Sequence, residues 1–193
     1  MDSPSRPSRR LAAGDLREED YCTDLVSSTV QDLGGLDIAV LNAAYQENRG
    51  GLENLPTAEF DRVSKTNLYG LLWVARAAIP HLRPGSSIIS TTSIQAFDPA
   101  PNLIDYAMTK AAQVAFTKAL AQDLGARGIR VNAVARPDRP GPRSSRPRSG
   151  RRRCPRSVKT LRWARAGQPA ELAPAYVFLA RQRLRTSPVR SSR

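Results

Sequence analysis

The 193-residue sequence has only two cysteines and one histidine. Cys22 and Cys154 lie far apart without the spacing of a metal-binding motif, so we expect two unpaired thiols and no metal site. A Ser-His-Asp triad would have to use His81, and nothing beside this residue indicates catalysis. The sequence also lacks an apolar run that could span a bilayer and an apolar signal segment after Met1. We therefore expect a protein of the cytoplasm without membrane attachment.

The net charge of +13 is concentrated in three segments. Residues 136–165 carry a net +11, residues 181–193 a net +5 and residues 1–10 a net +2, so the other residues sum to −5. Arginine-rich segments can bind phosphates or nucleic acid. These segments contain almost no aromatic residues, and their composition is typical of irregular chain. A non-catalytic basic protein that binds phosphate or nucleic acid is therefore the weaker alternative.

Short apolar runs alternate with helical patterns along most of the chain. Strands are expected at residues 36–41, 87–92 and 129–135, and helices at residues 14–33, 57–82, 102–126 and 166–180. The continuous run at 36–41 predicts a strand buried on both faces. Gly34 is expected to end the first helix, and Thr57 to be the N-cap of the second. Strands separated by helices predict an α/β fold with a parallel sheet.

Three residues in the segment 86–135 form a chemically meaningful pattern. Tyr106 and Lys110 are four residues apart on a predicted helix, which places them on one face about 6 Å apart along its axis. A lysine ammonium beside a phenol favours the phenolate, and lowering a tyrosine pKa from about 10 towards neutrality requires roughly 4 kcal/mol. Tyr106 could then act as a general acid or base. Ser93 follows a strand at its carboxyl end, where parallel sheets bind ligands.

The full pattern resembles the short-chain dehydrogenase/reductase family. The matching motifs are Ser93 thirteen residues before Tyr106, then Lys110; Thr66-Asn67-Leu68-Tyr69-Gly70; Leu41-Asn42-Ala43-Ala44 for the family's Asn-Asn-Ala-Gly; Arg130 to Val134; and the pair Asp15-Leu16. The resemblance covers roughly residues 11–135 and 166–180. Leu41 and Ala44 depart from the family's motif.

The resemblance implies an NAD(P)-dependent oxidoreductase with a small carbonyl or alcohol substrate. Catalytic residues would be Asn67, Ser93, Tyr106 and Lys110, and cofactor-binding residues would be Asp15, Leu16, Asn42, Ala43, Ala44, Tyr106 and Lys110. Tyr106 would exchange a proton with the substrate oxygen, which Ser93 would position. Lys110 would lower the pKa of Tyr106 and bind the nicotinamide ribose, and Asn67 would hold a water in a proton relay. The resemblance leaves the choice between NAD and NADP open, and it implies dimerisation through the long helices.

The family's Gly-rich turn for the cofactor pyrophosphate is missing from this sequence. We therefore expect a partial Rossmann-like parallel sheet with flanking helices, lacking the first two βα units and the last strand, and weakened cofactor binding. Without the family's first strand beside it, the strand at 36–41 would be an unpaired apolar edge. The expected parts are a partial core at 11–135, an Arg/Pro-rich irregular segment at 136–165, a core helix at 166–180 and a disordered basic tail at 181–193.

At Arg136 the family's Pro-Gly turn is also missing. A shift of one nucleotide in the reading frame permits Pro-Gly-Pro-Ile there, and we hypothesise that residues 136 to about 163 and 181–193 are frame-shifted. Resequencing the gene tests this hypothesis. An inactive remnant that only dimerises is a third possibility for the chain.

Overall fold

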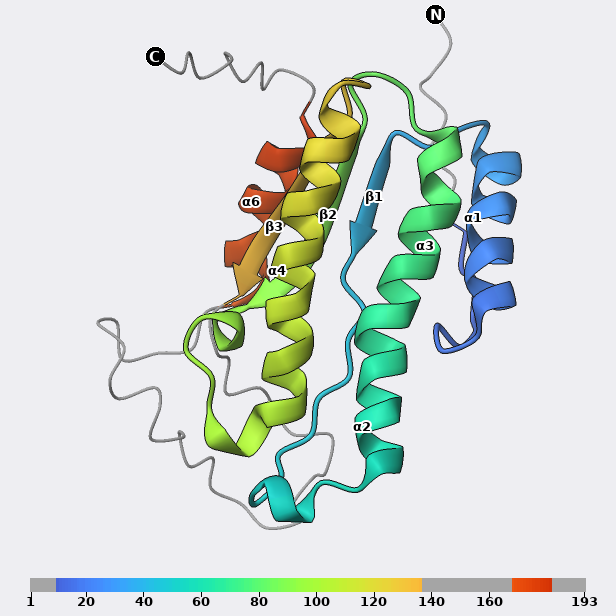
Figure 1. Cartoon of the computed structure of the whole chain (residues 1–193). Helices are drawn as coiled ribbons and strands as arrows, with labels where there is room; N and C mark the ends of the chain where they lie inside the picture. Colours follow the sequence, from blue (N-terminus) through green and yellow to red (C-terminus); the bar gives the residue numbers. More distant parts are fainter. Residues whose placement is uncertain (1–9, 137–167, 182–193) are drawn as a thin grey trace, which may run out of the picture.

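The computed structural model describes residues 10–136 and 168–181 (Figure 1). The main elements are α1 (Glu19–Leu33), β1 (Ile38–Leu41), α2 (Thr57–Ser64), the π-helical turn η2 (Lys65–Tyr69), α3 (Gly70–Ala78), β2 (Ser87–Ser93), α4 (Ile104–Gly125), β3 (Arg130–Arg136) and α6 (Pro169–Ala180). Short 3-10 turns are η1 (Leu52–Asn54), η3 (Ile79–His81), η4 (Ile94–Ala96) and η5 (Pro101–Leu103). The predicted irregular segment 136–165 and basic tail 181–193 lie outside the described residues, apart from Arg136 and Arg181.

The three strands form a parallel sheet in the order β1-β2-β3. Ser87 at the start of β2 pairs with Ile38 on one side and Arg130 on the other. Helices α3 and α4 lie on one face of the sheet, and α6 lies on the other (Figure 1). The Ser87 hydroxyl donates to the Leu179 carbonyl at 3.1 Å, which ties the end of α6 to β2. The predicted α/β fold with a partial Rossmann-like sheet is confirmed.

The main apolar core lies between the sheet and α4. Its buried residues are Ala39, Leu82, Ile88, Leu124, Ile129 and Val131. Alternating residues of a strand point to opposite faces, so Ile88 faces this core while Ile89 faces the side of α6. Both are essentially unexposed. This packing on both faces fixes the position of the carboxyl end of β2. Among the described residues, no helix combines the length and apolarity needed to cross a bilayer.

The prediction that strand 36–41 is buried on both faces is wrong. The strand is shorter, and its Ile38 and Val40 side chains are 46% and 49% exposed, while Ala39 is buried. The reason is position: β1 is the edge strand of the described sheet, and α6 packs against β2 and β3. An apolar edge strand of this kind is a template for pairing with another chain.

The predicted C-terminal end of α1 at Gly34 is confirmed, whereas the predicted N-cap of α2 is wrong. Gly34 ends α1 with φ +77°, and its N–H donates to the Val30 carbonyl at 2.9 Å. Thr57 is the first helical residue rather than the N-cap. Pro56 takes the cap position, and its carbonyl accepts from the N–H of Glu59. Proline is compatible with this position because its fixed φ of −65° is also found in extended backbone, which Pro56 adopts with a ψ of 145°.

Candidate active site

Tyr106 and Lys110 lie one turn apart on α4, as their spacing predicts. The Lys110 ammonium nitrogen is 5.4 Å from the centre of the Tyr106 ring. Both side chains are buried, with Lys110 1% exposed and Tyr106 4% exposed. A cation at this distance in a buried site interacts strongly with the aromatic ring system because water does not screen it. The structure therefore brings the two predicted residues into one local environment.

Ser93 is the last residue of β2, and the residue before it forms a hydrogen bond with α4. The hydroxyl of the preceding residue, Thr92, donates to the Lys110 carbonyl at 3.0 Å. The Ser93 oxygen accepts from the Gln95 N–H at 3.2 Å and caps the turn η4. This turn packs against α4. Ser93 thus lies at the carboxyl edge of the sheet, where its strand contacts α4.

The Lys110 ammonium is held by two neutral acceptors. It donates to the Thr91 carbonyl at 2.6 Å and to the Gln113 amide oxygen at 2.9 Å. Burial, together with a smaller effect of repulsion from Arg136, lowers the pKa of Lys110 to about 8. Burial has this direction because it disfavours the charged form. Lys110 can therefore change its charge within a pH range close to neutrality.

Asn67 lies in the π-helical turn η2 and is completely buried. Its amide forms two hydrogen bonds with the Tyr45 backbone, at 2.7 and 2.9 Å, and donates to the Thr109 hydroxyl at 3.0 Å. The Asn67 backbone carbonyl accepts from the Gln113 amide nitrogen at 2.7 Å. Asn67 therefore joins the segment after β1 to α4 one turn from Lys110. Its role as holder of a relay water stays a prediction.

Three of the predicted cofactor-binding residues line one open hollow beside the carboxyl end of β1. Leu16, Asn42 and Ala43 contribute to its wall, and its volume is about 120 Å³. The remaining wall residues are Leu25, Val40, Leu41, Thr66, Gly70, Leu71 and Val74. Most of these side chains are aliphatic, so the hollow suits a flat apolar ring. Neither Tyr106 nor Lys110 lines it.

The other two predicted cofactor-binding residues lie outside this wall. Asp15 precedes Leu16, and its carboxylate accepts from the Arg17 side chain at 2.9 Å. This hydrogen bond lowers the pKa of Asp15 to about 2. The side chain of Ala44 is exposed beyond Ala43. Asp15 is thus already paired within its own loop, and its contact with a cofactor stays a prediction.

Thr91 connects the hollow to α4, and nothing in the sequence pattern predicts this connection. Its hydroxyl donates to the Asn42 amide oxygen at 2.9 Å and lies 2.7 Å from the Tyr176 hydroxyl of α6. Because its single proton goes to Asn42, the Thr91 oxygen must accept from Tyr176. The Thr91 carbonyl accepts from Lys110, so one residue joins the two groups of predicted site residues.

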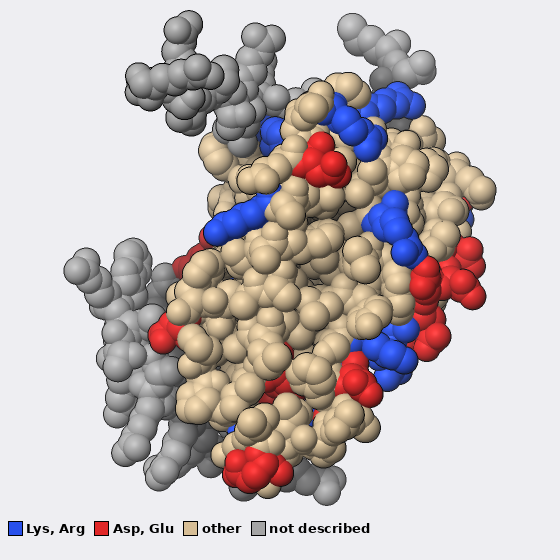
Figure 2. Space-filling view, viewed as in Figure 1, with Lys and Arg blue, Asp and Glu red and all other residues tan. Residues whose placement is uncertain are grey.

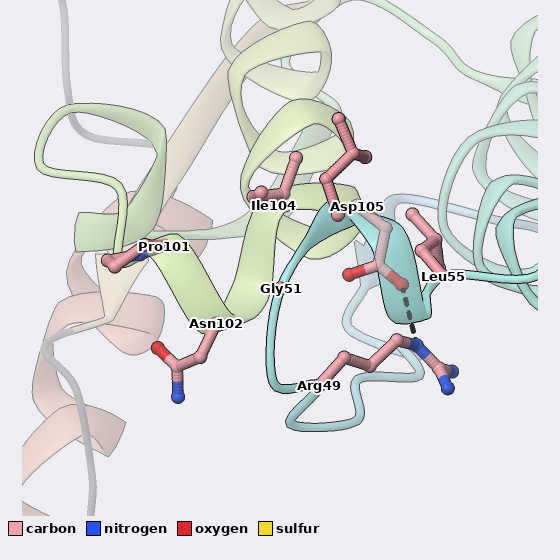
Figure 3. Close-up of a pocket in the computed structure, with 8 residues that line it drawn as sticks. Arg49, Gly51, Leu55, Pro101, Asn102, Ile104 and Asp105 are labelled. Atoms are coloured by element: carbon pink, nitrogen blue, oxygen red, sulfur yellow. Dashed lines mark hydrogen bonds and ion pairs between the residues drawn. The ribbon is translucent and has the colours of Figure 1, made fainter.

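Arg49 fixes the long segment after β1 against the start of α4 (Figure 3). Its side chain pairs with Asp105 at 3.5 Å and with Glu59 at 2.8 Å, and its N–H donates to the Asn102 carbonyl at 3.0 Å. The Asp105 carboxylate also accepts from the Tyr106 N–H at 2.7 Å. Arg49, Asn102 and Asp105 border a second, very small hollow of about 10 Å³. Arg49 therefore supports the helical turn that carries Tyr106.

Within the described part of the chain, no group of His, Cys, Asp or Glu residues is arranged to hold a metal ion. Cys22 is buried and unpaired, and burial raises the pKa of its thiol. Cys154 lies outside the described residues.

Comparison with known proteins agrees with this arrangement. A family profile described as Enoyl-(Acyl carrier protein) reductase matches residues 4–186. The oxidoreductase YhxD of Bacillus subtilis is 41% identical over 177 residues, which cover 88% of this chain and 58% of the relative. The chain belongs to the short-chain dehydrogenase/reductase family. It spans somewhat over half the length of the curated relatives that it matches.

Two solved structures give the same result. A short-chain dehydrogenase from Burkholderia cenocepacia in complex with NADP has a TM-score of 0.61 and 35% identity over 63% of this chain and 49% of its own. An NADH-dependent reductase complexed with NAD has a TM-score of 0.72 and 31% identity over 86% of this chain and 64% of its own. These similarities favour an enzyme over the basic binding protein considered from the charge.

Proposed function

We propose that the chain functions as an NAD(P)-dependent oxidoreductase that transfers a hydride between a nicotinamide and a small carbonyl or alcohol substrate. The observation that carries this proposal is the buried Lys110 ammonium 5.4 Å from the Tyr106 ring, at the end of β2 that bears Ser93. Family membership and the names of the relatives support it. The choice between the two nicotinamide cofactors stays open, because one similar structure holds NADP and the other NAD.

The chain's own residues would handle the proton of this reaction. Tyr106 would give a proton to the substrate oxygen during reduction and take it during oxidation. The Lys110 cation favours the phenolate because it stabilises the negative charge. The Ser93 hydroxyl would hold the same substrate oxygen by a hydrogen bond. General acid catalysis of this kind contributes about 10²- to 10⁴-fold to a rate.

The hollow beside β1 fits one end of the proposed cofactor. Its aliphatic wall and the single amide of Asn42 suit an adenine ring, while Tyr106 and Lys110 would contact the nicotinamide end. When bound, the nicotinamide supplies or accepts the hydride. No Gly-rich turn of the family's type occurs in the sequence, so fewer groups are available to hold the pyrophosphate. We propose that this chain alone binds the cofactor weakly.

Cofactor binding can be measured by the fluorescence of NADH and NADPH. We expect a dissociation constant on the order of 100 μM or weaker for both. An affinity of about 1 μM would contradict weak binding and would show that the residues of this chain suffice. The variant Ala43→Phe places a large side chain at an exposed residue of the wall and should abolish the remaining signal.

Hydride transfer itself is tested with NADH and NADPH carrying deuterium on the reactive carbon. The purified chain is incubated with a panel of aldehydes and ketones, and the alcohols are examined by mass spectrometry. Deuterium in the alcohol carbon supports the proposal. No labelled alcohol from any substrate, with either cofactor at millimolar concentration, would contradict it.

We also propose that the chain forms a homodimer through its two long helical segments, residues 57–78 (α2, η2 and α3) and α4. Figure 2 shows that the centre of this face is largely uncharged, with Lys, Arg, Asp and Glu around its edge. Leu72 on α3 and Met108 on α4 are 43% and 54% exposed. Leu72→Glu should lower the mass measured by light scattering, whereas Leu52→Glu, at an exposed site in η1, should not. A cytoplasmic location stays a prediction from the sequence.

A further inference from the structure

Gln113 bridges the two predicted catalytic residues that lie deepest in the molecule. It lies on α4, three residues after Lys110, and is 2% exposed. Its amide oxygen accepts from the Lys110 ammonium at 2.9 Å, and its amide nitrogen donates to the Asn67 carbonyl at 2.7 Å. An ammonium group can only donate and a carbonyl can only accept, so the two partners fix the orientation of the amide. A reversed amide would lose both hydrogen bonds.

Few of the groups around Lys110 stabilise its charged form, so Gln113 contributes an important part of that stabilisation. Tyr106 lies on the same helix, Thr91 offers only its carbonyl, and Arg136 at the end of β3 repels the ammonium. Asp105, in the first turn of α4, pairs with Arg49. Among the described residues, no carboxylate forms an ion pair with Lys110. The charged form of Lys110 therefore depends on neutral acceptors, and Gln113 supplies one of them.

We propose that Gln113 is a positioning residue that holds the Lys110 ammonium beside Tyr106 and determines the pH range in which Lys110 is charged. Its second hydrogen bond ties this lysine to the π-helical turn of Asn67. The consequence for catalysis rests on the proposed function, whereas the effect on the charge of Lys110 does not. Gln113 reaches the reacting groups only through Lys110, so it is not itself a catalytic residue.

Two substitutions should move the pKa of Lys110 in opposite directions. Gln113→Leu removes an acceptor from the charged form, which should lower the pKa from about 8 by roughly one to two units. Gln113→Glu places a carboxylate beside the ammonium and should raise the pKa by a similar amount, of about one unit or more. The glutamate variant also loses the hydrogen bond to the Asn67 carbonyl. It therefore separates the effect of the acceptor for Lys110 from the effect of the donor to Asn67.

The pKa of Lys110 can be measured without cofactor or turnover. The chain has four lysines, and the carbon next to each ammonium group, labelled with carbon-13, reports its protonation by NMR. Lys110→Arg assigns the signal. Gln122→Leu, an exposed glutamine on the same helix, is the matched control and should leave the titration unchanged.

The proposal is supported by a lower titration midpoint in Gln113→Leu and a higher one in Gln113→Glu. It is overturned if the midpoint stays within about 0.3 units of the wild type in the variants that fold. If Gln113→Leu does not fold, Gln113→Glu decides alone, since it preserves the size of the side chain. An inactive wild type would defeat the proposed function and leave this titration fully informative.

Discussion

Replacing Arg49 by methionine should destabilise the protein and disturb the turn that carries Tyr106. Methionine retains much of the aliphatic stem of arginine, so the loss is mainly that of the guanidinium group. Arg49 is 14% exposed and Asp105 only 2% exposed. The variant leaves the Asp105 carboxylate buried with its hydrogen bond from the Tyr106 N–H. Removing one partner of a buried ion pair costs about 3–5 kcal/mol.

The partial exposure of Arg49 places the expected cost near the lower limit, at about 3 kcal/mol. For a protein of this size the cost corresponds to a fall in Tm of roughly 6–12 °C. Urea unfolding of Arg49→Met, Asp105→Asn and the double variant measures the loss in free energy of unfolding and the interaction energy between the two side chains. The double variant should lose about 1–2 kcal/mol less than the sum of the single variants, because their side chains are in contact.

Arg76→Met is the control for a surface ion pair. Arg76 pairs with Glu19, and both side chains are at least half exposed, so the loss should stay below about 1 kcal/mol. An Arg49→Met variant that is as stable as Arg76→Met would refute the assignment of Arg49 as the support of α4.

Three further predictions follow from single contacts. Lys110 has a folded pKa of about 8, below its usual 10.5, so the unfolded chain binds more protons between these two pH values. The free energy of unfolding should therefore rise from pH 8 to pH 10.5 by up to about 3 kcal/mol. Urea unfolding of Lys110→Met should lack this rise, and the same pH dependence in Lys110→Met and the wild type would contradict the assignment. A Cβ on Gly70 would lie 2.8 Å from the Leu16 carbonyl oxygen, so Gly70→Ala should cost about 1–3 kcal/mol by thermal unfolding, while Gly125→Ala, with open space, should cost nothing. Ile38→Lys on the edge strand should reduce aggregation in light scattering without loss of stability, and unchanged aggregation would argue against this edge as its source.

The local parts of the site could be predicted from the sequence. A spacing of four residues on a helix places Tyr106 beside Lys110 whatever the rest of the fold, and Ser93 follows from the end of an apolar strand run. Asn67 needed the motif around it, since its hydrogen bonds reach residues 22 and 42 positions away in the sequence. The α/β fold follows in the same way from alternating strand and helix patterns.

The rest depends on contacts between distant segments. Arg49 meets Asp105 across 56 residues, and the Gln113 amide meets Asn67 across 46. Gln113 alone carries a local signal, because it shares a helix face with Lys110 at a spacing of three residues. The apolar run at 36–41 does not by itself show whether its strand lies inside a sheet or at an edge, so it predicts burial where Ile38 and Val40 are exposed. The edge position follows only from the resemblance, because the family's neighbouring strand is missing from the sequence.

The central claim is that Tyr106 transfers a proton during hydride transfer, and the most direct test is the turnover of Tyr106→Phe. Loss of the phenol group should reduce the rate of labelled alcohol formation by about 10²-fold or more. Tyr69→Phe, at a half-exposed tyrosine in η2, is the matched control and should keep the wild-type rate. A folded Tyr106→Phe variant with the same rate as Tyr69→Phe would contradict the account.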